Sequence, residues 1–220
     1  MSELRLTTTN DGSHSLLNAD LNEHYHSQHG ALQESIHVFL RSAFDLVQKP
    51  SVSILEYGFG TGLNALLTLH EAEKTKKKVH YTSLEASPLN ADITEQLNYA
   101  EKAGIDADLF ANLHRAGWNK VVEISPFFSL EKREQRFEDY SPEPNTYDLI
   151  YFDAFAPNYH PEAWSADVLT ACYKTLKTKG IWVSYCAQGA VRRTLMSVGF
   201  DVEKIPGPPG KREMLRGRKA

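Results

Sequence analysis

Three glycines at alternate positions, Gly58, Gly60 and Gly62, are the clearest chemical signal in this sequence. They follow a short apolar run, residues 52–55, that ends in Glu56, and a pattern with helical spacing comes directly after them. A strand, a glycine turn and a helix in this order are typical of a βαβ unit that binds a nucleotide. Glycine permits positive φ and lets a ligand approach without meeting a Cβ atom. Free N–H groups at the helix start suit a carboxylate or phosphate.

The spacing of the acids distinguishes two classes of cofactor. A dinucleotide-binding turn has the pattern G-x-G-x-x-G and a ribose-binding acid about 20 residues further on. Here Leu63 takes the place of the last glycine, and the next strand-like run ends at Glu85, 27 residues after Gly58 (85 − 58). A nicotinamide oxidoreductase is therefore disfavoured. A structural turn that binds nothing is the other alternative, but it does not require three glycines between two acids.

The pattern E-x-G-x-G-x-G, with an acid at the end of the second strand, resembles that of class I methyltransferases that bind S-adenosylmethionine. The resemblance implies that Glu85 accepts hydrogen bonds from the two ribose hydroxyls. It also implies that the glycine turn holds the methionine end, where Glu56 favours a cationic ligand.

A further acid, Asp153, ends a buried strand-like run at residues 147–152 and is followed by Phe155 and Pro157. The arrangement resembles the D-P-P-[FY] motif of enzymes that methylate amino nitrogens. An aliphatic amine is mostly protonated at neutral pH, and a carboxylate within reach can accept its proton or orient its lone pair. Phe155 could stack on a base or on the methyl donor. The alternative for Asp153 is a structural acid such as a helix N-cap.

Alternating strand and helix patterns would bring these acids together. The predicted strands cover residues 52–56, 79–85, 147–153, 180–186, 200–204 and 211–216, and the main predicted helices cover 31–47, 63–69, 161–176 and 189–198. This alternation predicts an α/β fold with a mostly parallel, Rossmann-like sheet, an antiparallel C-terminal hairpin at one edge and an N-terminal cap. Ligands of such sheets bind at the carboxyl ends of the strands, where all three acids are expected.

Length and composition limit the class of protein. A chain of 220 residues fits one α/β domain, in which residues 1–50 form an N-terminal segment with a short hairpin and a capping helix, and residues 51–220 form the methyltransferase domain. Two cysteines, no signal peptide and no long apolar run predict a cytoplasmic protein that does not enter membranes.

The charge distribution is uneven. The formal net charge is −4, which argues against a general nucleic-acid binder, but residues 192–219 carry eight basic and three acidic residues, a local excess of five (8 − 3). This segment could contact a polyanion, and an ordinary solvated surface is the alternative.

Three histidines between His24 and His29 raise the question of a metal. Their spacing matches neither one helical face nor a set with cysteine, so we expect no metal site. A loop over the pocket is the better interpretation, with Tyr25 and His26 as contacts.

Several motifs together resemble the tRNA (5-methylaminomethyl-2-thiouridine) methyltransferase family, which comprises MnmD and the methyltransferase half of bifunctional MnmC. They are Gly58-Phe-Gly-Thr-Gly-Leu-Asn64, Asp153-Ala-Phe-Ala-Pro157, Pro161-Glu-Ala-Trp164, Gly189-Ala-Val-Arg-Arg193, Gly207-Pro-Pro-Gly-Lys-Arg-Glu-Met-Leu215 and Glu34-Ser with Val38-Phe39. The resemblance covers residues 11–217.

The resemblance implies transfer of a methyl group from S-adenosylmethionine to the aminomethyl group of a wobble uridine in tRNA. It implies that Asp153 is the catalytic carboxylate and that Asn64 and the glycines contact the cofactor. Phe155, Pro157 and Trp164 would line the base pocket, with Lys211 and Arg212 near the substrate or the tRNA backbone. Because the chain ends at Ala220, the stand-alone form is expected, a monomer without the FAD-dependent oxidase.

Two segments depart from the family pattern. The family's Gly-Asp before the strand of Asp153 is replaced by residues 135–137, so no residue can be assigned to the adenine. The loop 158–164 is also altered. A methyltransferase for another amine, or a non-catalytic tRNA-binding module, remains an alternative, although a non-catalytic module has no need of all three acids.

Overall fold

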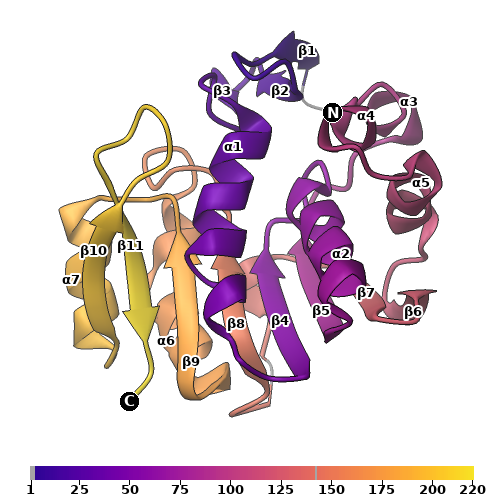
Figure 1. Cartoon of the computed structure of the whole chain (residues 1–220). Helices are drawn as coiled ribbons and strands as arrows, with labels where there is room; N and C mark the ends of the chain where they lie inside the picture. The colour runs from indigo at the N-terminus through magenta and orange to yellow at the C-terminus, as the bar shows by residue number, and fades with distance from the viewer. Residues whose placement is uncertain (1–2, 142) are drawn as a thin grey trace.

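Eight strands form the central sheet of the computed structural model, which describes residues 3–141 and 143–220 (Figure 1). In spatial order they are β10 (Asp201–Pro206), β11 (Glu213–Arg218), β9 (Leu176–Ser184), β8 (Tyr147–Phe152), β4 (Ser51–Tyr57), β5 (Lys78–Glu85), β7 (Phe128–Glu134) and β6 (Lys120–Ser125). The first two residues of the N-terminal segment lie outside the described residues.

The middle of the sheet is parallel, as predicted. β9, β8, β4, β5 and β7 pair in parallel, and β8 is buried along its whole length. A parallel strand is covered by helices on both faces, so an uninterrupted apolar strand belongs there. β10 and β11 form the predicted antiparallel hairpin at one edge. β6 adds an antiparallel strand at the other edge, and neither β6 nor β7 is among the strands predicted above.

A second, smaller sheet lies above the carboxyl ends of the large one (Figure 1). Its strands are β1 (Leu4–Thr8), β2 (His14–Asn18) and β3 (Glu23–His24), all antiparallel. The predicted short hairpin is therefore a three-stranded sheet. Leu16 shares the buried core with the helix after the glycine turn, which joins this segment to the rest of the protein.

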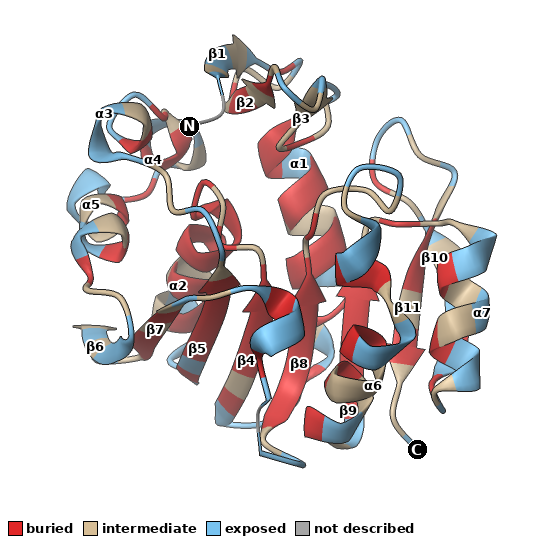
Figure 2. Cartoon of the chain, turned by 180° about the vertical axis from the view of Figure 1, so that it is seen from behind, coloured by how far each residue is buried: buried red, intermediate tan, exposed pale blue. Residues whose placement is uncertain are grey.

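Helices cover both faces of the large sheet (Figures 1 and 2). They are α1 (Ala31–Ser35), α2 (Leu63–Thr75), α3 (Ala91–Thr94), α4 (Tyr99–Ala103), α5 (Ala107–Arg115), α6 (Ala166–Thr175) and α7 (Gly189–Ser197). α1 and α2 lie on one face, and α6 and α7 lie on the other, so that two buried apolar clusters sandwich the strands. No helix among the described residues is both long and apolar enough to cross a bilayer.

The predicted helix 31–47 is wrong in its second half. After α1 the chain continues as a π-helical segment, Ile36–Arg41, and a separate 3₁₀ turn, Phe44–Leu46. The amide and the hydroxyl of Ser42 both donate to the carbonyl of His37, at 3.2 and 2.8 Å, which closes a wide turn and ends the helix.

The predicted helix 161–176 is also two elements. A 3₁₀ turn, Pro161–Trp164, precedes α6, and the Ser165 side chain caps α6 by accepting the amide of Val168. Serine favours this N-cap position because its oxygen satisfies an amide that has no partner within the helix.

Candidate active site

The glycine turn brings the ends of β4 and β8 together. Gly58, Gly60 and Gly62 all have positive φ, as expected for residues chosen for backbone freedom. A Cβ atom on Gly58 would lie 2.6 Å from the carbonyl oxygen of Asp153, so only glycine allows this approach. The turn is therefore built around the backbone of the residue after β8.

Glu85 ends β5 beside the same turn. Its Oε2 accepts the amide of Gly60 at 3.0 Å, and its Oε1 accepts the amide of Ser87 at 2.8 Å. Burial raises the pKa of Glu85 above its usual value, although these amides favour the ionised form. The carboxylate is thus held in a fixed orientation at the edge of the cavity.

Asp153 and Glu56 are joined through Asn64. The Nδ2 atom of Asn64 lies 2.8 Å from Oδ2 of Asp153 and 3.1 Å from Oε1 of Glu56, and Ser83 donates to the other Glu56 oxygen at 2.6 Å. Burial raises the pKa of Asp153 to about 7 and that of Glu56 to about 8. The Asp153 carboxylate further raises the pKa of Glu56, since like charges repel in a site of low polarity.

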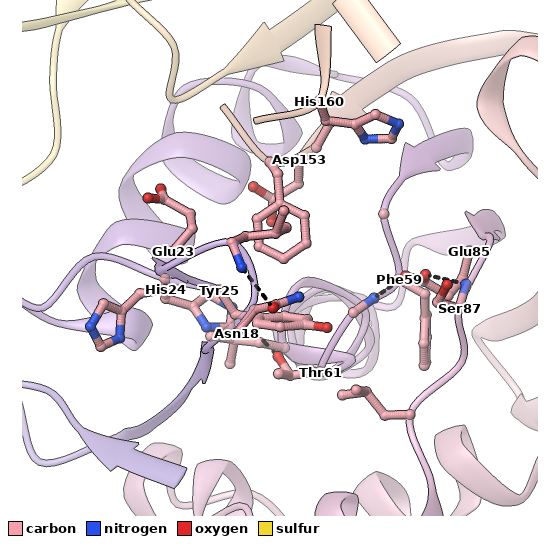
Figure 3. Close-up of a pocket in the computed structure, with 18 of the residues that line it drawn as sticks. Asn18, Glu23, His24, Tyr25, Phe59, Thr61, Glu85, Ser87, Asp153 and His160 are labelled. Atoms are coloured by element: carbon pink, nitrogen blue, oxygen red, sulfur yellow. Dashed lines mark hydrogen bonds between the residues drawn. The ribbon is translucent and has the colours of Figure 1, made fainter. Parts of the chain in front are cut away.

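A cavity of about 930 Å³ connects Glu85, Asp153 and Asn64, and its volume is at the upper end for small-ligand sites (Figure 3). In Figure 3, Glu85 and Ser87 lie on one side, Glu23 and His24 on the other, and Asp153 between them. The walls come from the small sheet, the glycine turn, the segment after β5, the segment after β8, Tyr185 and Lys211.

The small sheet supplies an aromatic cover, as the sequence suggested. The ring of Tyr25 meets Phe155 edge-on, with centroids 5.0 Å apart, and lies close to Gly60. His26 is buried beside it, with its ring nitrogens 3.4 Å from the hydroxyls of Ser15 and Thr61. Burial lowers the pKa of His26 to about 4, so it is neutral at physiological pH.

The structure brings most of the predicted residues to the cavity. Gly58, Gly60, Asn64, Glu85, Asp153, Phe155, Tyr25, His26 and Lys211 line it. Glu56 does not: it is 1 % exposed and lies behind Asn64, because its β4 position points between the sheet and α2. Gly62 shapes the turn without lining the cavity, and its αL conformation starts α2.

Trp164 is the main correction among the predicted pocket residues. Its indole is buried, packs against Phe152 with ring centroids 4.7 Å apart, and donates to the carbonyl of Phe155 at 2.8 Å. Trp164 therefore supports the Phe155 segment from behind. Pro157 and Arg212 also lie outside the cavity lining, and Arg212 is exposed.

Among the other polar residues of the cavity lining, Glu34 and Tyr185 were assigned no role from the sequence. Glu34 lies on α1, and from the sequence it was named only as part of a motif of the family resemblance. Tyr185 follows β9, where a side chain at the carboxyl end of a strand is a candidate by position. Within residues 3–141 and 143–220, no group of three His, Cys, Asp or Glu side chains is arranged to hold a metal.

Known proteins resemble this chain in sequence. Residues 135–220 match the sequence model of a family described as S-adenosyl-L-methionine-dependent methyltransferase. A "tRNA 5-methylaminomethyl-2-thiouridine biosynthesis bifunctional protein MnmC" from Methylobacillus flagellatus is 30 % identical over 88 % of this chain and 32 % of that protein. The protein of the same name from Marinomonas sp. is 31 % identical over 88 % of this chain and 31 % of that protein. The chain spans about a third of the length of these curated relatives.

A solved structure resembles the fold as a whole. MNMC2 from Aquifex aeolicus superimposes with a TM-score of 0.78 and 26 % identity, over 99 % of this chain and 70 % of that one.

Proposed function

We propose that this chain belongs to the family of S-adenosyl-L-methionine-dependent methyltransferases that includes its MnmC relatives, and that it methylates the aminomethyl nitrogen of 5-aminomethyl-(2-thio)uridine at the wobble position of tRNA. The product is 5-methylaminomethyl-(2-thio)uridine. The observation that carries the proposal is the partly buried Asp153 carboxylate, held by Asn64 in the same cavity as Glu85 and the glycine turn.

The cavity fits the cofactor on its own chemistry. Two glycines of the turn, Gly58 and Gly60, line the cavity without a Cβ atom. A fixed carboxylate stands at the end of β5 with lone pairs beyond those used by the two amides. When bound, S-adenosylmethionine supplies an electrophilic methyl group on a sulfonium. In our proposal Glu85 binds the ribose hydroxyls, Gly58 and Gly60 lie against the methionine end, and Phe137, which also lines the cavity, contacts the adenine.

Asp153 would serve the substrate amine. The ammonium form of the substrate would give up a proton to Asp153, and the freed lone pair would then be available to the methyl group that the bound cofactor supplies. A carboxylate with a pKa near 7 can accept a proton at neutral pH and return it to water after transfer. Asn64 keeps Asp153 in one orientation during this exchange, which preserves alignment with the methyl group.

Tyr25 and Phe155 would hold the uracil. Sequence-specific RNA recognition commonly takes a base out of the stack and places it between aromatic side chains. The two rings contact each other and line the same cavity as Asp153. Their contact would also exclude water from the amine.

The basic C-terminal segment supports tRNA contact through a few side chains only. Lys204 pairs with Glu213, and Arg216 pairs with Glu203, so these charges are used within the protein. Arg212 and Arg193 are exposed, on the turn after β10 and on α7, and we propose that they meet the tRNA backbone. We also propose that residues 1–50 belong to the same domain as residues 51–220.

The test is a methyl-transfer assay with labelled S-adenosylmethionine and bulk tRNA from cells that lack this protein. Nucleoside analysis should show aminomethyl-uridine converted to methylaminomethyl-uridine. Asp153→Asn should lower turnover by about 10²–10⁴-fold, typical of a lost acid–base group, while cofactor binding stays within a few-fold. Cofactor binding without label in tRNA would redirect the search to other amines.

A further inference from the structure

Lys211 lies on the cavity wall, but its ammonium group is occupied by partners within the protein. The Nζ atom is 3.0 Å from Oε1 of Glu34 and 4.0 Å from the ring centroid of Tyr185. The Lys211 side chain is 35 % exposed and that of Glu34 only 10 %. An ammonium engaged with a carboxylate and an aromatic face in a partly dry site has little left for a phosphate.

Both partners of Lys211 lead back to Asp153. Glu34 lines the same cavity, and its other oxygen accepts the amide of Ser27 at 2.8 Å, so the carboxylate is fixed. Tyr185 donates its hydroxyl to the carbonyl of Ala154 at 2.8 Å, directly after Asp153. Lys211 therefore contacts both Glu34, a charged residue of the same cavity, and Tyr185, whose hydroxyl bonds the backbone directly after Asp153.

The Lys211–Glu34 pair also joins two parts of the chain. Glu34 belongs to α1, whereas Lys211 belongs to the turn between β10 and β11. A ring nitrogen of His37, one helical turn after Glu34, lies 2.8 Å from the carbonyl oxygen of Pro206 at the end of β10. Gly210 packs on the side chain of His29, so closely that an added Cβ would require the ring to move. The C-terminal turn is thus attached to the N-terminal cap at three points.

We propose that Lys211 is a positioning residue for Asp153, which acts by pairing with Glu34 and by packing on Tyr185, and that it does not bind tRNA phosphate. This inference deepens the proposed function and rests on it for the role of Asp153 in catalysis. It separates two neighbours that the sequence groups together, because Arg212 is exposed and Lys211 points inward.

The pair balances the charge at Asp153. The Glu34 carboxylate raises the pKa of Asp153, and the Lys211 ammonium lowers it. The other titratable groups whose charges couple to Asp153 are Glu56, Tyr81 and Tyr185. Removal of Lys211 alone leaves Glu34 unopposed, so the pKa of Asp153 rises; removal of Glu34 alone lowers it; removal of both cancels most of the change.

The experiment is a pH titration of the Asp153 carboxyl carbon by ¹³C NMR in protein labelled at aspartate, with Asp153→Asn to assign the signal. We expect Lys211→Met to raise the midpoint by about half a pH unit or more, as loss of a nearby opposite charge does. Glu34→Gln should lower it, and the double variant should return close to the wild-type value. Lys211→Arg keeps the charge and should stay near wild type, which provides a second variant if Lys211→Met does not fold.

Lys74→Met is the matched control, because it removes a lysine that pairs with a glutamate on the exposed side of α2, 3.4 Å away. It should leave the midpoint unchanged. Binding to bulk tRNA is measured in parallel at several salt concentrations. Arg212→Met should reduce the slope of the logarithm of the binding constant against the logarithm of salt concentration by about one, whereas Lys211→Met should leave this slope unchanged.

An unmoved Asp153 midpoint in Lys211→Met, or a salt slope reduced as much as in Arg212→Met, would overturn the inference. The titration needs no turnover. Failure of the wild type to methylate tRNA would therefore reject the proposed function, while the NMR midpoints still decide whether Lys211 and Glu34 act on Asp153.

Discussion

The side-chain amide nitrogen of Asn64 lies 2.8 Å from Oδ2 of Asp153. The same nitrogen contacts Glu56 at 3.1 Å, so one amide group bonds both the buried carboxylate of β4 and the partly buried carboxylate that follows β8. This bond lowers the pKa of Asp153, against the larger effect of burial, which raises it. Asn64 therefore sets both the orientation of the proposed catalytic acid and how readily it ionises.

Replacement of Asn64 by alanine should slow methyl transfer through Asp153. Loss of a hydrogen bond to a charged group costs about 1.5–3 kcal/mol, or roughly 10–100-fold in kcat/KM at neutral pH. Because the pKa of Asp153 then rises above about 7, the acid limb of the pH–rate profile should move to higher pH, with partial recovery in alkali. A uniform loss at every pH would mean that Asn64 acts on something other than the ionisation of Asp153.

Glu85→Gln should weaken cofactor binding. The neutral amide makes weaker hydrogen bonds to ribose hydroxyls than a carboxylate does. Its NH₂ group would also face the backbone N–H of Gly60 or Ser87, each of which donates to a carboxylate oxygen in the wild type. We expect the Kd for S-adenosylmethionine to rise by roughly 10–100-fold, measured by titration calorimetry. Glu95→Gln, an exposed acid after α3, serves as the control and should bind normally. Equal affinity in both variants would remove Glu85 from the cofactor site.

Glu56→Gln should change how stability depends on pH. The pKa of Glu56 is about 8 in the folded protein against an ordinary value of 4.5, so the native state holds a proton that the unfolded chain releases. The stabilisation is complete below about pH 4.5 and is lost as pH rises through about 8. The variant lacks this pH dependence. Between acid and alkaline pH, its free energy of unfolding should therefore rise by on the order of 1–3 kcal/mol relative to that of the wild type.

Urea denaturation across this pH range measures the effect. Glu101→Gln provides the control, because that carboxylate is 79 % exposed and should give curves parallel to wild type. A constant difference between Glu56→Gln and wild type would show that the pKa of Glu56 is the same in the folded and the unfolded protein.

Trp164→Phe should affect stability more than cofactor binding. The variant loses the hydrogen bond to the Phe155 carbonyl and part of the packing on Phe152, at a cost of about 1–3 kcal/mol in the free energy of unfolding. Urea denaturation and the Kd for S-adenosylmethionine are the two measurements. Unchanged stability with a raised KM for tRNA would restore Trp164 to the base pocket.

Much of the fold followed from patterns local in the chain. The apolar run of β8, buried throughout, could only be a strand covered on both faces, and its terminal acid had to lie at the ligand edge of the sheet. The glycine turn likewise requires positive φ at each of its three glycines, whatever surrounds it. The predicted helices 31–47 and 161–176 were wrong because each is interrupted, at Ser42 and at Ser165. These interruptions depend on side-chain hydrogen bonds of the two serines, which leave no periodic signal in the sequence.

The sequence by itself determined which chemistry the chain carries: a turn for a nucleotide-like cofactor and acids at the ends of three strands. Tertiary structure decided which acid faces the ligand, because strand-end position does not say how deep a side chain lies. Glu56 is covered by Asn64, whereas Glu85 and Asp153 line the cavity. It also decided the partner of Lys211, since Glu34 is 177 residues away in the chain and meets it only when the cap closes over the sheet. Pairs of residues so far apart in the chain depend on how the elements pack, and a local sequence pattern does not reveal that packing.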